Sequence, residues 1–225
     1  MQATKLLRTE LEWLNMGFHG LIDDMTDEEW TARPVPGLNL PGYTLWHVAR
    51  TPDFIVQTGL RHMPEVITQE RWASCGSLTT PGFGIGLSLV EADALAHAVK
   101  RKDVSAYADA VLAEVIAWLD TLSDDDLDTV PAWHSYIAEY PQYNVPGIVN
   151  APEDPIWDYL LGTCGFHVRG HLTEVAIIKQ EVRQGTTVAV SESTTEEPST
   201  LVTVTAPASS SRRRRWPWGQ RDPQR

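Results

Sequence analysis

Cysteine is scarce in this chain and long apolar runs are absent, and these two shortages exclude several classes of protein. The only cysteines are Cys75 and Cys164, too few for a disulfide framework. No run of about 18 apolar residues occurs, so we expect no transmembrane helix. The first residues, MQATKLLRTELEWL, lack the apolar stretch of a signal peptide. We therefore expect a cytoplasmic protein with no membrane partner.

Basic residues are also few outside the last forty positions. The 225-residue chain has a net charge of −12, yet residues 186–225 contain six Arg and only four acidic residues. Residues 1–185 are left with 12 basic and 26 acidic residues, a net charge of −14. Such a surface repels nucleic acid at long range, so we expect no nucleic-acid partner.

Helical periodicity is the main structural signal. The first helix is predicted by apolar residues at alternating steps of four and three: Leu7, Leu11, Leu14, Phe18, Leu21 and Met25. We expect a second helix over about 43–62, kinked at Pro52, and a third with Asp103 as its N-cap. Its apolar stripe is Val104, Tyr107, Val111, Val115, Leu119 and Leu122. The last helix is predicted to have Asp154 as its N-cap and Pro155 at its first helical position, and to run to about Gln184, with Gly185 as its stop. With no strand-like run, the sequence predicts an all-α four-helix bundle with long connections.

The connections have their own signals. Thr26 with Glu29, and Ser88 with Glu91, are capping-box patterns. Residues 33–42 should not be helical. Residues 63–87 form a predicted loop whose PGFGIG stretch lacks the strand, helix and Lys of a phosphate loop, so we interpret it as a connection. The long segment 123–153 is either a lid or a packed surface loop. Residues 186–225 cannot form a core, and we expect a disordered tail after a bundle domain at 1–185.

Two histidines in the last helix indicate a metal site. His167 and His171 are four residues apart and share a face. They fall on one stripe with apolar residues, Leu160, Cys164, Val175 and Ile178. A buried imidazole needs a partner, and one ion satisfies both rings. His47, among apolar neighbours on the second helix, is the expected third ligand. Three imidazoles leave a position open and suit zinc best, with nickel, cobalt or iron as alternatives.

Other readings of these residues stay open. HxxxH often arises by chance, and the HExxH motif of metalloproteases is absent because Val168 stands where its Glu would be. Cys164 is by default a small buried hydrophobe and alternatively a fourth ligand. The remaining histidines are expected to be ordinary surface or capped residues, although the loop of His134 could fold over the site. These residues are His19, His62, His97 and His134.

Two stretches resemble the DinB superfamily of metal-binding bundles. They are LEWLNMGFHGLIDDMTDEEWTARPVPGLNLPGYTLWHVAR at 11–50 and DPIWDYLLGTCGFHVRGHLTEV at 154–175, and the similar layout extends over residues 1 to about 184. The superfamily includes bacterial thiol transferases of the YfiT type and relatives of mycothiol-dependent maleylpyruvate isomerase. The resemblance implies a divalent metal on His47, His167 and His171. It also implies a low-molecular-weight thiol such as mycothiol, bacillithiol or glutathione.

These observations leave three hypotheses for function. The first is a metal-dependent thiol S-transferase or isomerase acting on a small electrophilic molecule, with Arg50 as a weak candidate for substrate binding and Tyr43 for proton donation. The second is a metal-dependent hydrolase with Glu174 as base or as a partner of His171. The third is a non-enzymatic metal or small-molecule binding protein. Arg50 in an ordinary salt bridge and Tyr43 in the core are the plain alternatives, and a homodimer is plausible.

Overall fold

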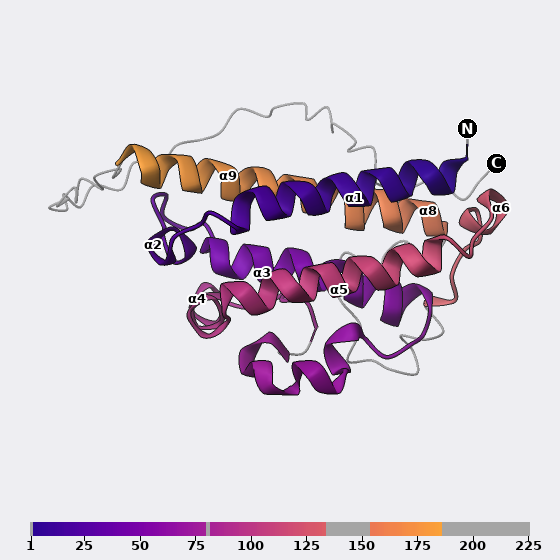
Figure 1. The fold of residues 1–225 in the computed structure, drawn as a ribbon, viewed down its shortest axis with the longest axis horizontal. Coiled ribbons are helices and arrows are strands. Elements are labelled where there is room, and N and C mark those ends of the chain that lie inside the picture. Colours follow the sequence, from indigo (N-terminus) through magenta and orange to yellow (C-terminus); the bar gives the residue numbers. More distant parts are fainter. Residues whose placement is uncertain (1, 80–81, 134–153, 186–225) are drawn as a thin grey trace, which may run out of the picture. The chain divides into compact units, whose positions relative to one another are not determined.

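The computed structural model describes residues 2–79, 82–133 and 154–185 (Figure 1). This part of the chain is helical and contains no strand. Two of its long segments are single α-helices, and the other two are each part α-helix and part π-helix. They are α1 (Ala3–Ile22), α3 (Pro41–Pro52) with the π-helix η1 (Asp53–Leu60), α5 (Arg101–Leu119), and α8 (Ile156–Asp158) with the π-helix η5 (Tyr159–His167) and α9 (Val168–Gln184). The predicted all-α four-helix bundle is confirmed.

The four long segments run in two opposite directions. Figure 1 shows α1 and α9 running the same way, with α3 and α5 running the opposite way below them. Polar contacts fix this arrangement. Arg8 Nη1 on α1 donates to Asp120 Oδ2 beyond the end of α5 at 2.6 Å. Lys179 Nζ on α9 donates to the Leu21 carbonyl at the end of α1 at 2.7 Å. The helices α3 and α9 are also in contact with each other.

Short helices fill the connections. They are α2 (Asp27–Trp30), α4 (Leu89–Ala98), α6 (Asp124–Leu127), and the 3₁₀ segments η2 (Val66–Thr68) and η3 (Glu70–Thr79). Both predicted capping boxes, at Thr26 and Ser88, are present, and Ser123 forms a third one before α6. The predicted loop 63–87 therefore contains helical turns, which its glycines and prolines had obscured.

Several predicted boundaries were wrong by a few residues. The first helix ends at Ile22, not near Met25. Asp103 is not the N-cap of α5, because Lys100 precedes the helix and Asp103 lies in its first turn, where an acid is equally favourable. Pro41 begins α3 inside the segment predicted to be non-helical, since proline is well tolerated at the first helical position. Pro155, in contrast, precedes its helix. Gly185 ends α9 in the left-handed conformation, as predicted.

The core follows the predicted apolar stripes of the first and third helices with two exceptions, Leu21 and Leu122. On α1, Ile22 is buried in place of Leu21, which is only partly buried. Among the tryptophans, Trp46 is fully buried, Trp118 is partly buried, and Trp157 is 39% exposed. Trp133 was not expected in the core, yet it is 1% exposed and stacks on Tyr159 with ring centroids 5.5 Å apart. Its position inside a polar segment hid this role.

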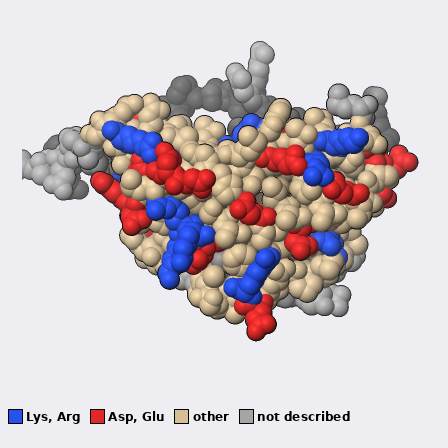
Figure 2. Space-filling model, viewed as in Figure 1, with Lys and Arg blue, Asp and Glu red and all other residues tan. Residues whose placement is uncertain are grey.

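The surface carries mixed charge. Acidic and basic side chains are interspersed over the face shown in Figure 2. No helix in the described ranges is long and apolar enough to cross a membrane. Residues 134–153, which include His134, and the predicted tail at 186–225 lie outside the described residues.

Candidate metal centre

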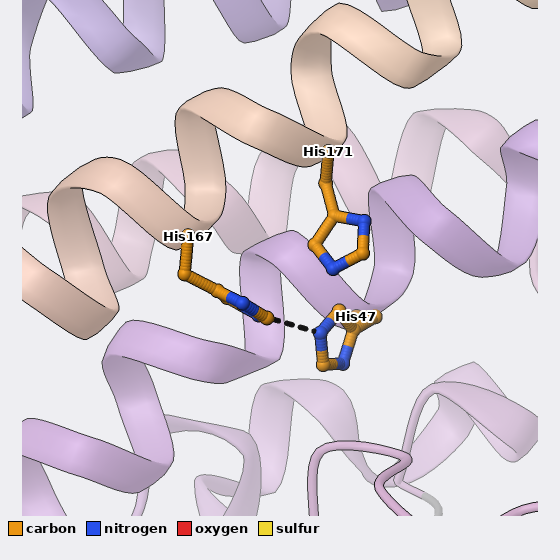
Figure 3. A group of neighbouring side chains, drawn as sticks. All are labelled: His47, His167 and His171. Carbon is orange, nitrogen blue, oxygen red and sulfur yellow. Dashed lines mark hydrogen bonds between the residues drawn. The ribbon is translucent and has the colours of Figure 1, made fainter. Parts of the chain in front are cut away.

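Three histidines converge where α3 packs against η5 and α9. His47 comes from the middle of α3, His167 ends η5, and His171 follows one turn later on α9. Figure 3 shows the three rings directed into the same space from the two helices. The structure thus brings together the three residues that the sequence picked out, although His47 is 120 residues from His167 in the chain.

The spacing of the rings suits one ion. His47 Nε2 and His167 Nε2 lie 3.0 Å apart. Each of the three histidines offers one nitrogen such that all three nitrogens lie within 4.8 Å of one another. Ligand nitrogens in a tetrahedral zinc site are about 3.3 Å apart, given metal–nitrogen distances of roughly 2.0–2.1 Å. The observed spacing is therefore of the size that such a site needs, and an all-imidazole donor set suits a borderline divalent ion.

The three rings differ in burial. His47 is 5% exposed, whereas His167 and His171 are half-buried, with the His171 side chain 27% exposed. Burial lowers the pKa of His47 to about 4, and burial with the nearby His171 ring lowers the pKa of His167 to about 4. Both rings are therefore neutral at pH 7, which is the form that binds metal. The sequence pattern placed His167 and His171 on the buried apolar stripe of the last helix, whereas in the structure both are only half-buried.

Two of the rings have hydrogen-bond partners on the side away from the cluster. His47 Nδ1 donates to the carbonyl oxygen of Phe83. Since a carbonyl only accepts, Nδ1 carries the hydrogen and Nε2 keeps its lone pair for the cluster. His171 Nδ1 lies 3.0 Å from Glu174 Oε2. Partners of this kind orient metal-binding imidazoles and raise their basicity.

A family model places the chain among known proteins. The model described as the DinB superfamily matches residues 10–174. The chain belongs to the DinB superfamily. A conserved protein from Enterococcus faecalis, solved by crystallography, has a TM-score of 0.63 and 19% sequence identity. The alignment covers 82% of this chain and 99% of that one, and at this identity the likeness concerns the fold alone. No curated protein matches the chain.

The other candidate residues of this DinB-superfamily member lie around the triad. Tyr43 is one turn before His47, and its ring stacks on the His47 ring with centroids 6.1 Å apart. Its hydroxyl donates to the Gly84 carbonyl at 2.7 Å, and burial raises its pKa. Cys164 is buried one turn before His167 and lines an apolar cavity with Val48 and Val168, and burial raises its pKa to about 12. It does not join the three histidines.

Arg50 lies on the same face of α3 but is enclosed. Its side chain is 1% exposed and donates to Asp53, Glu65, Tyr107 and the Gly82 carbonyl. The structure therefore shows the salt-bridge alternative, and the guanidinium has no donor turned toward a substrate. The opposite charges and the Tyr107 hydroxyl raise the pKa of Arg50, which keeps it charged.

Sequence reasoning missed the segment behind His47. The PGFGIG stretch was interpreted as a plain connection, yet the carbonyl oxygens of Gly82, Phe83 and Gly84 receive hydrogen bonds from α3. The available signal was the glycine spacing itself. Gly82, Gly84 and Gly86 all have positive φ, a conformation that other residues rarely adopt.

Proposed function

We propose that His47, His167 and His171 hold one divalent metal ion, and that the protein is a metal-dependent transferase or isomerase acting on a small electrophile with a low-molecular-weight thiol. The observation that carries the metal site is the convergence of three imidazoles from two helical segments, of which His47 and His167 have pKa values lowered to about 4. The thiol chemistry rests on superfamily membership. Zinc is the favoured ion, with nickel, cobalt or iron as alternatives.

The chain's own residues perform defined tasks in this proposal. A bound divalent ion supplies positive charge that favours thiolate over thiol at the position which three protein ligands leave open. His47 is held by the Phe83 carbonyl with its Nε2 directed at the His167 ring, where it would be available as a metal ligand. Glu174 orients His171 through Nδ1. Because the Glu174 carboxylate already accepts this hydrogen bond, an orienting role is favoured over that of a general base in hydrolysis. The half-exposed rings of His167 and His171 mark the side from which small molecules enter.

Metal content tests the site directly. We expect about one equivalent of transition metal in purified protein and little in a His167→Ala variant, since two remaining ligands chelate poorly. His97→Ala is the matched control, because His97 is an exposed histidine on α4, outside the cluster. Equal metal in the wild type and the His167→Ala variant would overturn the proposed site.

Turnover separates the three functional hypotheses. Metal-loaded protein is incubated with a thiol and the electrophile monochlorobimane, with and without chelator. Conjugation that chelator abolishes supports the transferase. Ester hydrolysis without thiol would instead support a metal-dependent hydrolase, and metal binding without either turnover would support a binding protein.

We also propose a cellular compartment, a functional domain and a class of partner for this activity. Cys75 and Cys164 are both free thiols, which agrees with a reducing cytoplasm. We propose residues 1–185 as the functional domain, a small molecule as its partner, and no role in binding nucleic acid or membranes. A homodimer stays a prediction.

A further inference from the structure

Side chains on one face of α3 donate hydrogen bonds to three consecutive backbone carbonyls. Tyr43, His47 and Arg50 lie on this face because they are spaced by four and three residues. Tyr43 Oη donates to the Gly84 carbonyl at 2.7 Å. His47 Nδ1 donates to the Phe83 carbonyl. Arg50 donates to the Gly82 carbonyl from Nε at 3.0 Å and from Nη2 at 2.8 Å. The candidate metal ligand is thus the middle one of three side chains that bind one short segment.

The Gly82–Gly84 segment fits this face only with glycine at position 84. A Cβ on Gly84 would lie 2.6 Å from Tyr43 Oη and 2.8 Å from the Trp46 ring, and its φ of +94° is strained for any other residue. Phe83 itself is buried, stacked on His47 with ring centroids 5.7 Å apart and packed on Phe54 at 4.8 Å. The backbone therefore approaches α3 closely and cannot slide along it.

The two outer donors are themselves held in place. Arg50 Nη1 donates to Asp53 Oδ2 at 3.1 Å and to Tyr107 Oη at 2.8 Å, and Nη2 donates to Glu65. Tyr43 is buried, and its ring packs on Trp46 with centroids 5.9 Å apart. Neither side chain is free to follow the segment if the segment moves. They therefore define where the Phe83 carbonyl lies.

His47 depends on this arrangement more than the other two histidines do. His167 and His171 share one helical segment, so their mutual spacing follows from the backbone, and His171 has Glu174 beside it. The described partner of His47 Nδ1 is a backbone oxygen on a segment that is remote in sequence. A displaced carbonyl would free the ring to exchange tautomers, and a hydrogen on Nε2 would block its lone pair.

We propose that Tyr43 and Arg50 are positioning residues: they hold the carbonyls on both sides of Phe83, so that the Phe83 carbonyl fixes His47 with Nε2 available to metal. This inference rests on the proposed function, because it assigns a role to residues behind the proposed metal ligand. It also gives the glycine-rich stretch a purpose, since a close, strained backbone is needed to aim three neighbouring carbonyls at one helix.

Metal affinity is the first measurement, with Zn²⁺ alone as the probe and a competing chelator as the indicator. Gly84→Ala is compared with Gly86→Ala. Both replace a glycine with positive φ, but a Cβ on Gly86 meets nothing within 4 Å. We expect Gly84→Ala and the milder Tyr43→Phe to weaken Zn²⁺ binding by about tenfold or more, and Gly86→Ala by no more than about twofold. Equal affinities for Gly84→Ala and Gly86→Ala would overturn the inference.

Nitrogen NMR of the imidazoles in metal-free protein is the second measurement, and it does not depend on metal binding. His47 should show a single tautomer with hydrogen on Nδ1 in the wild type and in Gly86→Ala. Tautomer averaging is expected in Gly84→Ala and Tyr43→Phe, a change that a loss of stability alone would not produce in a folded protein.

The outcomes separate the two proposals. If His47→Ala and the wild type bind Zn²⁺ equally, the proposed function fails. If the wild-type His47 ring nevertheless shows a single tautomer, the positioning of that ring by the Phe83 carbonyl still stands. If His47→Ala loses binding while Gly84→Ala matches Gly86→Ala in affinity and tautomer, the metal site stands and the positioning role fails.

Discussion

Replacing Arg50 by methionine should remove a large share of the stability of the fold. The guanidinium is 1% exposed and pairs with Asp53, which is fully buried, and with Glu65, which is 9% exposed. Methionine fills similar volume but leaves two buried carboxyl groups without a cation. Breaking a buried ion pair by removing one partner costs about 3–5 kcal/mol, so we expect the free energy of unfolding to fall by about that amount. The Asp53 carboxylate retains the Val66 and Ile67 amides, which limits the loss.

The loss should depend on pH in a defined direction. Burial raises the pKa of Asp53 and of Glu65, and the Arg50 charge opposes this rise. Without Arg50 both pKa values rise further above their unfolded values of about 4, so the folded state binds more protons than the unfolded state. Stability then falls as pH rises through this range. The destabilisation by Arg50→Met should therefore be smaller near pH 5 than near pH 8.

Urea unfolding followed by tryptophan fluorescence, in the presence of chelator, measures this effect. Arg33→Met is the matched control. Arg33 also donates to a backbone carbonyl, that of Leu38, and to a carboxylate, that of Asp93, but its side chain is 24% exposed. We expect it to cost about 1 kcal/mol or less. Equal losses for the two variants, or a loss for Arg50→Met that does not change with pH, would refute the reasoning.

Three further perturbations have clear expected outcomes. Burial opposes a charge on His19, but the hydrogen bonds that its ring nitrogens donate to Asp109 and Asp23 raise its pKa, so His19→Gln should lose stability relative to the wild type near pH 5.5 and match it above about pH 8, as urea midpoints will show. Gly59→Ala should cost about 3 kcal/mol, because its Cβ would lie 1.4 Å from the Trp133 ring, and a cost below about 1 kcal/mol would mean that the ring moves aside freely. Zn²⁺ at about 100 times its dissociation constant should stabilise the wild type by about 2.7 kcal/mol and leave His167→Ala unchanged in thermal melts.

Local signals in the sequence predicted much of this fold because they act over a few residues. Apolar stripes at helical spacing identified the long helices, and Thr26 and Ser88 marked helix starts through their own side-chain hydrogen bonds. His167 and His171 were paired by their spacing, and His47 was predicted as the third ligand from its apolar neighbours on the second helix, a choice that the superfamily resemblance also implied. Residues that are favourable at more than one position of a helix were a less reliable guide to helix boundaries. Asp103 favours a helix start both as a cap and in the first turn, which explains the misplaced beginning of α5.

Contacts between distant residues could not be predicted in this way. Arg50 meets Tyr107 from 57 residues away, and neither residue alone indicates that the other is its partner. The Phe83 carbonyl that holds His47 is a backbone group, so it has no residue type by which a motif could reveal it. Glycines at 82 and 84 signalled unusual backbone, but not which helix that backbone would approach.

The partial exposure of His167 and His171 has no signature in the apolar pattern. The predicted stripe is buried on both sides of the pair, at Leu160 and Cys164 before it and at Val175 and Ile178 after it. The π-helical segment η5, which ends at His167, therefore does not turn the residues that follow it away from the core. The pair differs from these neighbours in its contacts, because both rings meet the His47 ring on α3, with centroids 5.2 and 5.0 Å apart. An apolar stripe identifies the inward face of a helix, but not how completely the neighbouring helix covers that face at each turn, so the sequence could not have predicted that these two rings would be only half-buried.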